Sequence, residues 1–196
     1  MDAQILSVAL EVKASRQWRA SWKLWAASLL RDGEIAIGRS FPEAFFPVPR
    51  EGLGEVELQT RAEIMGGGDS DLRVAGRARL HQFARENSRP ASWVVLADAD
   101  CLALRNLDHL LIDEGELLVA RSGIGYDPGF VAVSGERLGE YLDMVEVLEL
   151  NGVVSSGKFA VAEFERGEVL RAGDPGVTVE DLANAAVMHF GGPSRR

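Results

Sequence analysis

Short apolar runs alternate with stretches of helical spacing along the 196-residue chain. Runs rich in β-branched and aromatic residues predict strands at residues 5–10, 34–38, 93–97, 117–120, 130–134, 168–171 and 185–190. Apolar residues spaced three or four apart predict helices at residues 15–30, 74–86, 136–150 and 158–166. Strands that alternate with helices indicate an α/β fold, in which helices flank a mixed, mainly parallel sheet. The length suits a single domain over residues 1–196.

Three segments have an unusual residue composition: one is rich in tryptophan, one in proline and phenylalanine, and one in glycine. The first predicted helix has an apolar stripe of Trp18, Trp22, Trp25 and Leu29. This stripe is typical of a helix packed on a sheet, and a stacking platform for bases or sugars is the alternative. Prolines and phenylalanines predict an irregular segment at residues 41–49. The glycine-rich residues 65–73 lack the Gly-Lys-Ser/Thr ending of a phosphate-binding loop, so a lid or connector is expected there.

Composition narrows the function classes. The formal net charge of -9 and the sequence pI of about 4.9 argue against a general nucleic-acid binder, which normally carries a basic face. The single cysteine, Cys101, excludes an internal disulfide and a cysteine-based zinc site, and its apolar neighbours indicate a core residue. We find neither a signal peptide nor the roughly 20 apolar residues of a membrane span, so a cytoplasmic location is expected.

Two aspartates follow the apolar run "WVVLA". Asp98 and Asp100 are two residues apart, so in extended backbone their side chains project to the same face. Ligands of α/β sheets bind beyond the carboxyl ends of the strands, where these aspartates fall. Two close carboxylates repel unless a cation compensates, and oxygen donors favour Mg²⁺ or Mn²⁺. A pair of turn or capping aspartates is the structural alternative.

Two further patterns carry candidate chemistry. His189 ends an apolar run and leads into two glycines, a proline and two arginines. It is either a structural histidine or a metal ligand, and imidazole beside carboxylates shifts the preference towards Mn²⁺. In "GYDPGF", Asp127 can accept hydrogen bonds from sugar hydroxyls and Gly129 allows close backbone approach to a ligand. An ordinary Asp-Pro-Gly turn explains the same residues.

Together these patterns resemble the glycosyltransferase family that includes glycogenin and the bacterial galactosyltransferases, which has a GT-A fold. The segment "VVLADADCLALRNLDHLL" is similar to the family's strand, D-x-D and following segment. "RLHQF" resembles a stretch on the preceding helix, "YDPGFVAVS" the family's F-N-x-G strand, and "HFGGPSRR" its late H-F-x-G-x-x-K block. The resemblance extends in order over roughly the whole chain.

The resemblance implies a UDP-sugar-dependent hexosyltransferase, expected to be retaining, with Mn²⁺ or Mg²⁺ as cofactor and an unknown acceptor. Asp98, Asp100 and His189 would bind the metal, and Asp98 would also touch the ribose. Asp127 would be the catalytic residue. The nucleotide-sugar would be bound by Ala9, Leu10, Glu11, Arg79, Asp98, Ala99, Gly129, Gly192 and Arg195.

The chain departs from the family pattern at two places. Asp127 stands at the position where the family has an asparagine, and Lys158-Phe159 stands where the family has an Asp-Gln pair. Two alternatives therefore stay open. One is a haloacid-dehalogenase-like phosphatase with Asp98 as nucleophile and Asp100 as acid/base. The other is a non-catalytic module that binds a sugar nucleotide.

Overall fold

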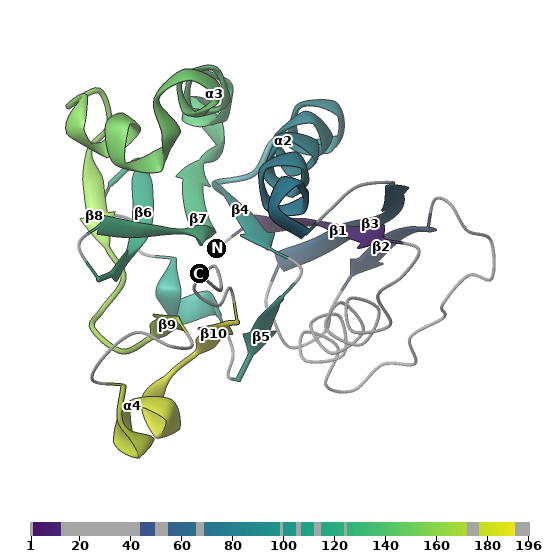
Figure 1. The fold of residues 1–196 in the computed structure, drawn as a ribbon. Helices are drawn as coiled ribbons and strands as arrows, with labels where there is room; N and C mark the ends of the chain where they lie inside the picture. Colours follow the sequence, from purple (N-terminus) through teal and green to yellow (C-terminus); the bar gives the residue numbers. More distant parts are fainter. Residues whose placement is uncertain are drawn as a thin grey trace.

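A computed structural model describes residues 2–12, 44–49, 55–65, 69–98, 100–104, 107–111, 115–123, 125–171 and 177–190. In this part of the chain the strands form one seven-stranded and one three-stranded sheet. Helices α2 (Asp69–Asn87) and α3 (Leu138–Ser155) cover one face of the large sheet. The small sheet and α4 (Val179–Asn184) lie on the other face (Figure 1).

The large sheet is mixed, and most of its strands run in one direction. Its order is β2 (Ala44–Pro49), β3 (Glu55–Met65), β1 (Asp2–Val12), β4 (Trp93–Asp98), β7 (Gly125–Ser134), β6 (Leu117–Ser122) and β8 (Val161–Glu163). The pairs β1–β3, β1–β4 and β6–β8 are parallel. The pairs β2–β3, β4–β7 and β6–β7 are antiparallel, so only β2 and β7 run against the rest. This confirms the predicted fold class.

The small sheet connects the end of β4 with the end of the chain. It consists of β5 (Cys101–Ala103), β10 (Val187–His189) and β9 (Val169–Arg171) in that order. Strand β10 pairs antiparallel with β5 and parallel with β9. Because β5 begins just after the end of β4, this pairing brings the end of β10 to the carboxyl end of β4. Two short 3-10 helices, Asp108–Leu110 and Gly135–Arg137, complete the described elements.

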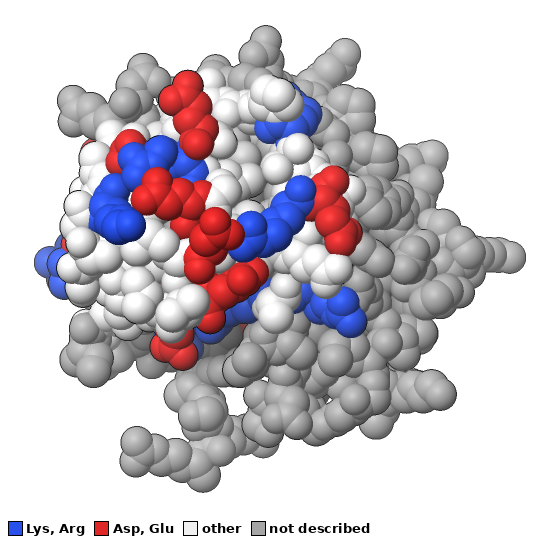
Figure 2. All heavy atoms as spheres, turned by 90° about the horizontal axis from the view of Figure 1, so that it is seen from above, with Lys and Arg blue, Asp and Glu red and all other residues white. Residues whose placement is uncertain are grey.

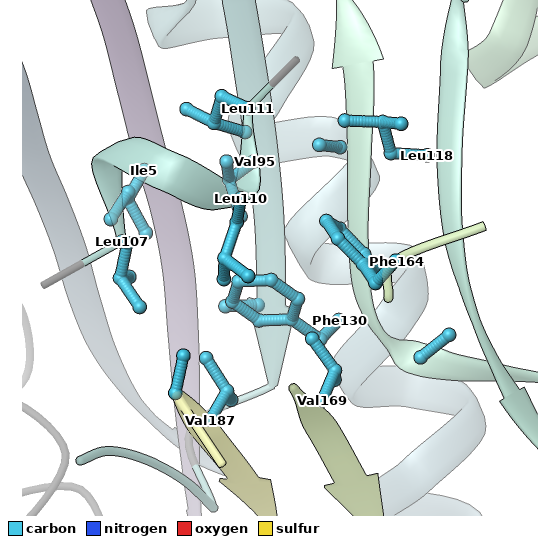
Figure 3. Close-up of a cluster of buried hydrophobic side chains, with 14 of the residues drawn as sticks. Ile5, Val95, Leu107, Leu110, Leu111, Leu118, Phe130, Phe164, Val169 and Val187 are labelled. Atoms are coloured by element: carbon cyan, nitrogen blue, oxygen red, sulfur yellow. The ribbon is translucent and has the colours of Figure 1, made fainter. Parts of the chain in front are cut away.

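Two hydrophobic clusters hold the layers together, one on each face of the large sheet. The first lies between the two sheets and includes Ile5, Val95, Leu107, Leu110, Leu118, Phe130, Phe164, Val169 and Val187 (Figure 3). The second lies under the helices and includes Leu6, Leu80, Phe83, Val94, Leu96, Tyr141 and Leu142. Residues of β4 alternate between the two clusters, so both faces of this strand are buried. An uninterrupted apolar run is the sequence pattern that such a strand requires.

The helical face is charged and mixed in sign. Figure 2 shows acidic and basic side chains interleaved over the described residues of this face. Arg85 of α2 pairs with Asp143 and Glu146 of α3 at 2.8 and 3.1 Å. Such exposed pairs contribute little stability each. Because acidic and basic side chains are interleaved, the described residues of this face form no continuous basic surface.

The sequence predictions hold for the strongly apolar strands and are wrong at two segments. The expected lid or connector at residues 65–73 fails in part as well, because Met65 ends β3 and residues 69–73 begin α2, while residues 66–68 lie outside the described residues. Strands were predicted at residues 93–97, 117–120, 130–134, 168–171 and 185–190, and all are present. Helices at residues 74–86 and 136–150 are confirmed as parts of α2 and α3. Residues 5–10 lie within β1. The predictions at residues 15–30 and 34–38 fall outside the described residues.

The first wrong prediction is the irregular segment at residues 41–49, because residues 44–49 form β2. Pro47 and Pro49 are tolerated because β2 is an edge strand, which needs backbone hydrogen bonds on one side only. The second is the helix at residues 158–166, where β8 lies instead. Phe159 packs in the cluster under the helices and Phe164 in the cluster between the sheets, so the segment passes through the sheet layer.

The elements that were missed altogether are β3, β5, α4 and the 3-10 helix Asp108–Leu110. Strand β3 shows alternating apolar positions that we did not recognise, and α4 has a capping box in which Thr178 and Asp181 bond each other's backbone N–H. Among the described helices, none has the length and apolarity needed to cross a lipid bilayer.

Helix α3 is broken at Glu149. This residue has φ 56° and ψ 173°, a backbone conformation that glycine adopts readily and other residues rarely. Val147 and Leu148, just before the break, are 80% and 45% exposed. The break therefore stores backbone strain at the helix surface.

Glu149→Gly should relieve this strain. We expect the free energy of unfolding to rise by about 1 kcal/mol, since the strain relieved exceeds the added freedom of glycine in the unfolded chain. Glu140→Gly, at a helical position of the same helix, should lower it by about 1 kcal/mol through helix propensity, and by a little more through loss of the exposed ion pair with Arg137. Urea denaturation of both variants measures this. A loss of stability in Glu149→Gly equal to that of the control would contradict the strain.

Candidate metal centre

Three side chains with metal-binding atoms converge at the carboxyl end of β4. The His189 Nε2 atom lies 3.2 Å from Asp100 Oδ1 and 3.6 Å from Asp98 Oδ2. One ligand atom of each residue lies within 4.8 Å of the other two. The two carboxylates are each 22% exposed, whereas the imidazole is 2% exposed. The predicted metal ligands are thus brought together, and they are reachable from the carboxylate side.

The convergence follows from strand pairing. Asp98 is the last residue of β4, and Asp100 lies in the turn between β4 and β5. His189 is the register partner of Cys101, the first residue of β5. The Phe190 N–H also donates a hydrogen bond to the Asp100 carbonyl at 3.0 Å. These backbone contacts fix the distance between the D-x-D turn and the end of β10.

The second nitrogen of His189 is also engaged. Its Nδ1 lies 2.7 Å from Asp127 Oδ2, and both side chains are 2% exposed. The other oxygen of Asp127, Oδ1, accepts a hydrogen bond from the Gly129 N–H at 3.0 Å. Asp127 therefore lies behind the imidazole, on the side away from Asp98 and Asp100.

Gly129 leaves the space that the imidazole occupies. A Cβ at this position would lie 2.2 Å from His189 Cε1 and 2.5 Å from both ring nitrogens. The Cys101 Sγ, 3.4 Å from the Gly129 carbonyl, borders the same space and is buried, as predicted for a core residue. The predicted close approach of backbone at Gly129 is thus an approach to His189.

The surrounding carboxylates favour the protonated, positively charged form of the His189 imidazole. Burial alone would lower the pKa of His189, but hydrogen bonds to Asp100 and Asp127 and the charge of Asp98 raise it to about 10. Burial raises the pKa of Asp98, against the charges of Arg77 and His189. Burial would likewise raise the pKa of Asp127, but the hydrogen bond from His189 and its charge bring it below the ordinary value.

An arginine that the sequence did not single out lies beside the cluster. Arg77 Nη2 of α2 is 3.6 Å from Asp98 Oδ2, and the arginine side chain is 35% exposed. Arg79, one of the predicted nucleotide-sugar contacts, donates a hydrogen bond to Gln82 on the helix surface at 3.0 Å. Helical spacing alone does not distinguish them, since Arg77 lies three residues before the buried Leu80 and Arg79 four residues before the buried Phe83.

The remaining predicted residues are placed only in part. Ala9, Leu10 and Glu11 lie at the carboxyl end of β1, just beyond Val8, the register partner of Asp98. Ala99, Gly192 and Arg195 lie outside the described residues. Arg171, another residue that we did not predict, is the register partner of His189 on β9. Its charge contributes to the lowered pKa of Asp127.

The donor set fits a divalent cation. Two carboxylates and one imidazole nitrogen are ligands of the kind that Mg²⁺ and Mn²⁺ accept, and imidazole favours the latter. The His189 Nε2 atom faces Asp98 and Asp100, whereas Asp127 is hydrogen-bonded to the other ring nitrogen, Nδ1. The geometry thus leaves one imidazole and two carboxylate donors directed to the same space.

The fold is that of solved glycosyltransferases. A glycosyltransferase involved in the glycosylation of the major capsid of PBCV-1 matches with 11% identity and a TM-score of 0.59, over 100% of this chain and 95% of that chain. The glycosyltransferase GlyE of Streptococcus pneumoniae TIGR4 matches with 14% identity and a TM-score of 0.58, over 100% of this chain and 56% of that chain. No protein-family model and no curated protein sequence matches.

Gly129→Ala should disturb the imidazole directly. Because its Cβ would overlap the ring, we expect the free energy of unfolding to fall by about 1–3 kcal/mol. Gly139→Ala is the matched control, since a Cβ there meets nothing within 4 Å in α3, and it should be neutral or stabilising. Urea denaturation compares the two. Equal stability of both variants would show that the ring does not fill the space at Gly129.

Proposed function

We propose that the protein is a metal-dependent glycosyltransferase. It transfers a hexosyl group from a UDP-sugar to an acceptor of unknown identity, with the retention of configuration that the family resemblance implies. Mn²⁺ is the proposed cofactor, and Mg²⁺ is the alternative. The glycosyltransferase fold supports this proposal, and the convergence of Asp98, Asp100 and His189 at the carboxyl end of β4 carries it.

The proposed chemistry is cleavage of the bond between the sugar and the diphosphate. Negative charge develops on the leaving phosphate oxygen, and a divalent cation held by Asp98, Asp100 and His189 would supply the charge that stabilises it. The protein's own part is to hold three donors in place while the two aspartates remain partly open to solvent. The donor would therefore approach from the carboxylate side of the cluster.

Arg77 is the proposed phosphate contact among the described residues. Its guanidinium lies beside Asp98 and is partly exposed, so it can pair with a phosphate on the same side. Arg195, with the backbone of Gly192 and Ala99, belongs to the proposed nucleotide-sugar site on the family resemblance alone. Ala9, Leu10 and Glu11 are proposed to lie beside the base. We further propose that residues 1–196 form a single domain, that nucleic acid is not a partner and that the protein acts in the cytoplasm.

Loss of one ligand should weaken metal-dependent nucleotide binding. Asp100→Ala and His189→Ala should each lower the affinity for UDP in the presence of Mn²⁺ by at least about tenfold, since one coordination bond is lost. Isothermal titration of UDP with and without Mn²⁺ measures this, and Asp143→Ala on the surface of α3 is the control. Full-strength, Mn²⁺-dependent binding in both variants would refute the proposed metal site.

The two arginines of α2 provide a matched pair. Arg77→Gln should weaken UDP binding with Mn²⁺ by about tenfold, because a charge-assisted hydrogen bond to phosphate is lost. Arg79→Gln should bind as the wild type does, since Arg79 bonds Gln82 on the helix surface. Isothermal titration distinguishes them. The reverse order of affinities would assign the phosphate contact to Arg79.

Turnover decides between the proposed activity and its alternatives. Incubation with UDP-sugars and Mn²⁺ should release UDP together with free or transferred sugar. Binding of UDP without release would identify a non-catalytic sugar-nucleotide module. Hydrolysis of a generic phosphate ester that Asp98→Asn abolishes would identify a phosphatase.

A further inference from the structure

Asp127 has no oxygen available for a substrate. Its Oδ2 lies 2.7 Å from His189 Nδ1, its Oδ1 accepts from the Gly129 N–H at 3.0 Å, and its side chain is 2% exposed. Each carboxylate oxygen could accept a second hydrogen bond, but the burial of the side chain keeps a sugar hydroxyl away from it. Exposing the carboxylate would disturb its buried hydrogen bonds, and an unpaired buried polar group is costly.

We propose that Asp127 is a positioning residue that fixes the ring of His189. An ionised carboxylate can only accept hydrogen bonds, so Nδ1 of His189 carries a proton and donates a hydrogen bond to Asp127. The opposite nitrogen, Nε2, is then the one directed towards Asp98 and Asp100, at 3.6 and 3.2 Å. Asp127 thus selects which imidazole nitrogen the cluster presents. The consequence for metal binding rests on the proposed function.

Gly129 contributes to the same device in two ways. Its N–H holds Oδ1 of Asp127, which fixes the rotation of the carboxylate. Gly129 also has no Cβ, and this makes room for the imidazole. A Cβ at this position would lie 2.2 Å from His189 Cε1 and clash with the ring. The Asp-Pro-Gly sequence that resembles a turn therefore forms one wall of the histidine's pocket, within strand β7.

Asp127→Asn in the full chain tests the positioning role, because it keeps the volume and changes one hydrogen-bond direction. The asparagine oxygen can replace Oδ1 at the Gly129 N–H, which turns the amide NH₂ towards His189. The Nδ1 atom must then accept, so the proton of a neutral ring moves to Nε2. Asp143→Asn, an exposed change on α3, is the matched control.

Two readouts follow the ring and the metal separately. Nitrogen NMR of ¹⁵N-histidine-labelled protein reports the protonated nitrogen of each of the three histidines, and His189→Gln assigns the His189 signal. The carboxylates raise the pKa of His189, so the spectra are recorded at a pH high enough to make the ring neutral. Under that condition we expect the proton on Nδ1 in the wild type and on Nε2 in Asp127→Asn. Titration with Mn²⁺ alone should show affinity reduced by about 10- to 100-fold in Asp127→Asn and unchanged in Asp143→Asn.

The outcomes separate this inference from the proposed function. If the wild type binds no Mn²⁺ but the protonated nitrogen changes as expected, the proposed metal site fails and the positioning role stands. If the His189 signals of Asp127→Asn match the wild type, the positioning role is overturned. Should Asp127→Asn fail to fold, the wild-type spectrum decides, and a neutral ring with its proton on Nε2 overturns the inference.

Discussion

His189 belongs to the small sheet, yet both of its ring nitrogens face carboxylates carried by or next to the large sheet. Asp98 ends β4, Asp100 follows it, and Asp127 lies in β7. A buried charge is costly unless it is paired, so the imidazole and the carboxylates stabilise one another only while the two sheets stay docked. The cluster between the sheets keeps them docked, and the site depends on that packing.

The same packing determines how much chemistry each aspartate can perform. Asp98 and Asp100 are each 22% exposed, whereas Asp127 is 2% exposed and bonded on both oxygens. Three carboxylates surround one ring, but only two of them can meet a solute. Equal residue types thus have different roles because the strands hold them at different depths.

The strands that form the core were predictable, since burial on both faces leaves an apolar run such as "WVVLA". The D-x-D and His189 were also recognisable as candidate ligands. Their convergence on one point came from the family resemblance alone, because the register of His189 with Cys101 is a long-range contact with no local signal. The partner of Asp127 was missed for the same reason, since an Asp-Pro-Gly segment has a sufficient local explanation as a turn.

Similarity at 11 to 14% identity extends over the whole chain, so the fold persists where few side chains are shared. Fold alone does not determine chemistry, which resides in the few residues of the site. In this chain the hydrogen-bonded pair of Asp127 and His189 is buried in the protein interior, behind Asp98 and Asp100. Among the described residues of the cluster, Asp98, Asp100 and Arg77 are the ones partly open to solvent. A solute that meets the cluster therefore contacts that side, because Asp127 and His189 behind it are each 2% exposed.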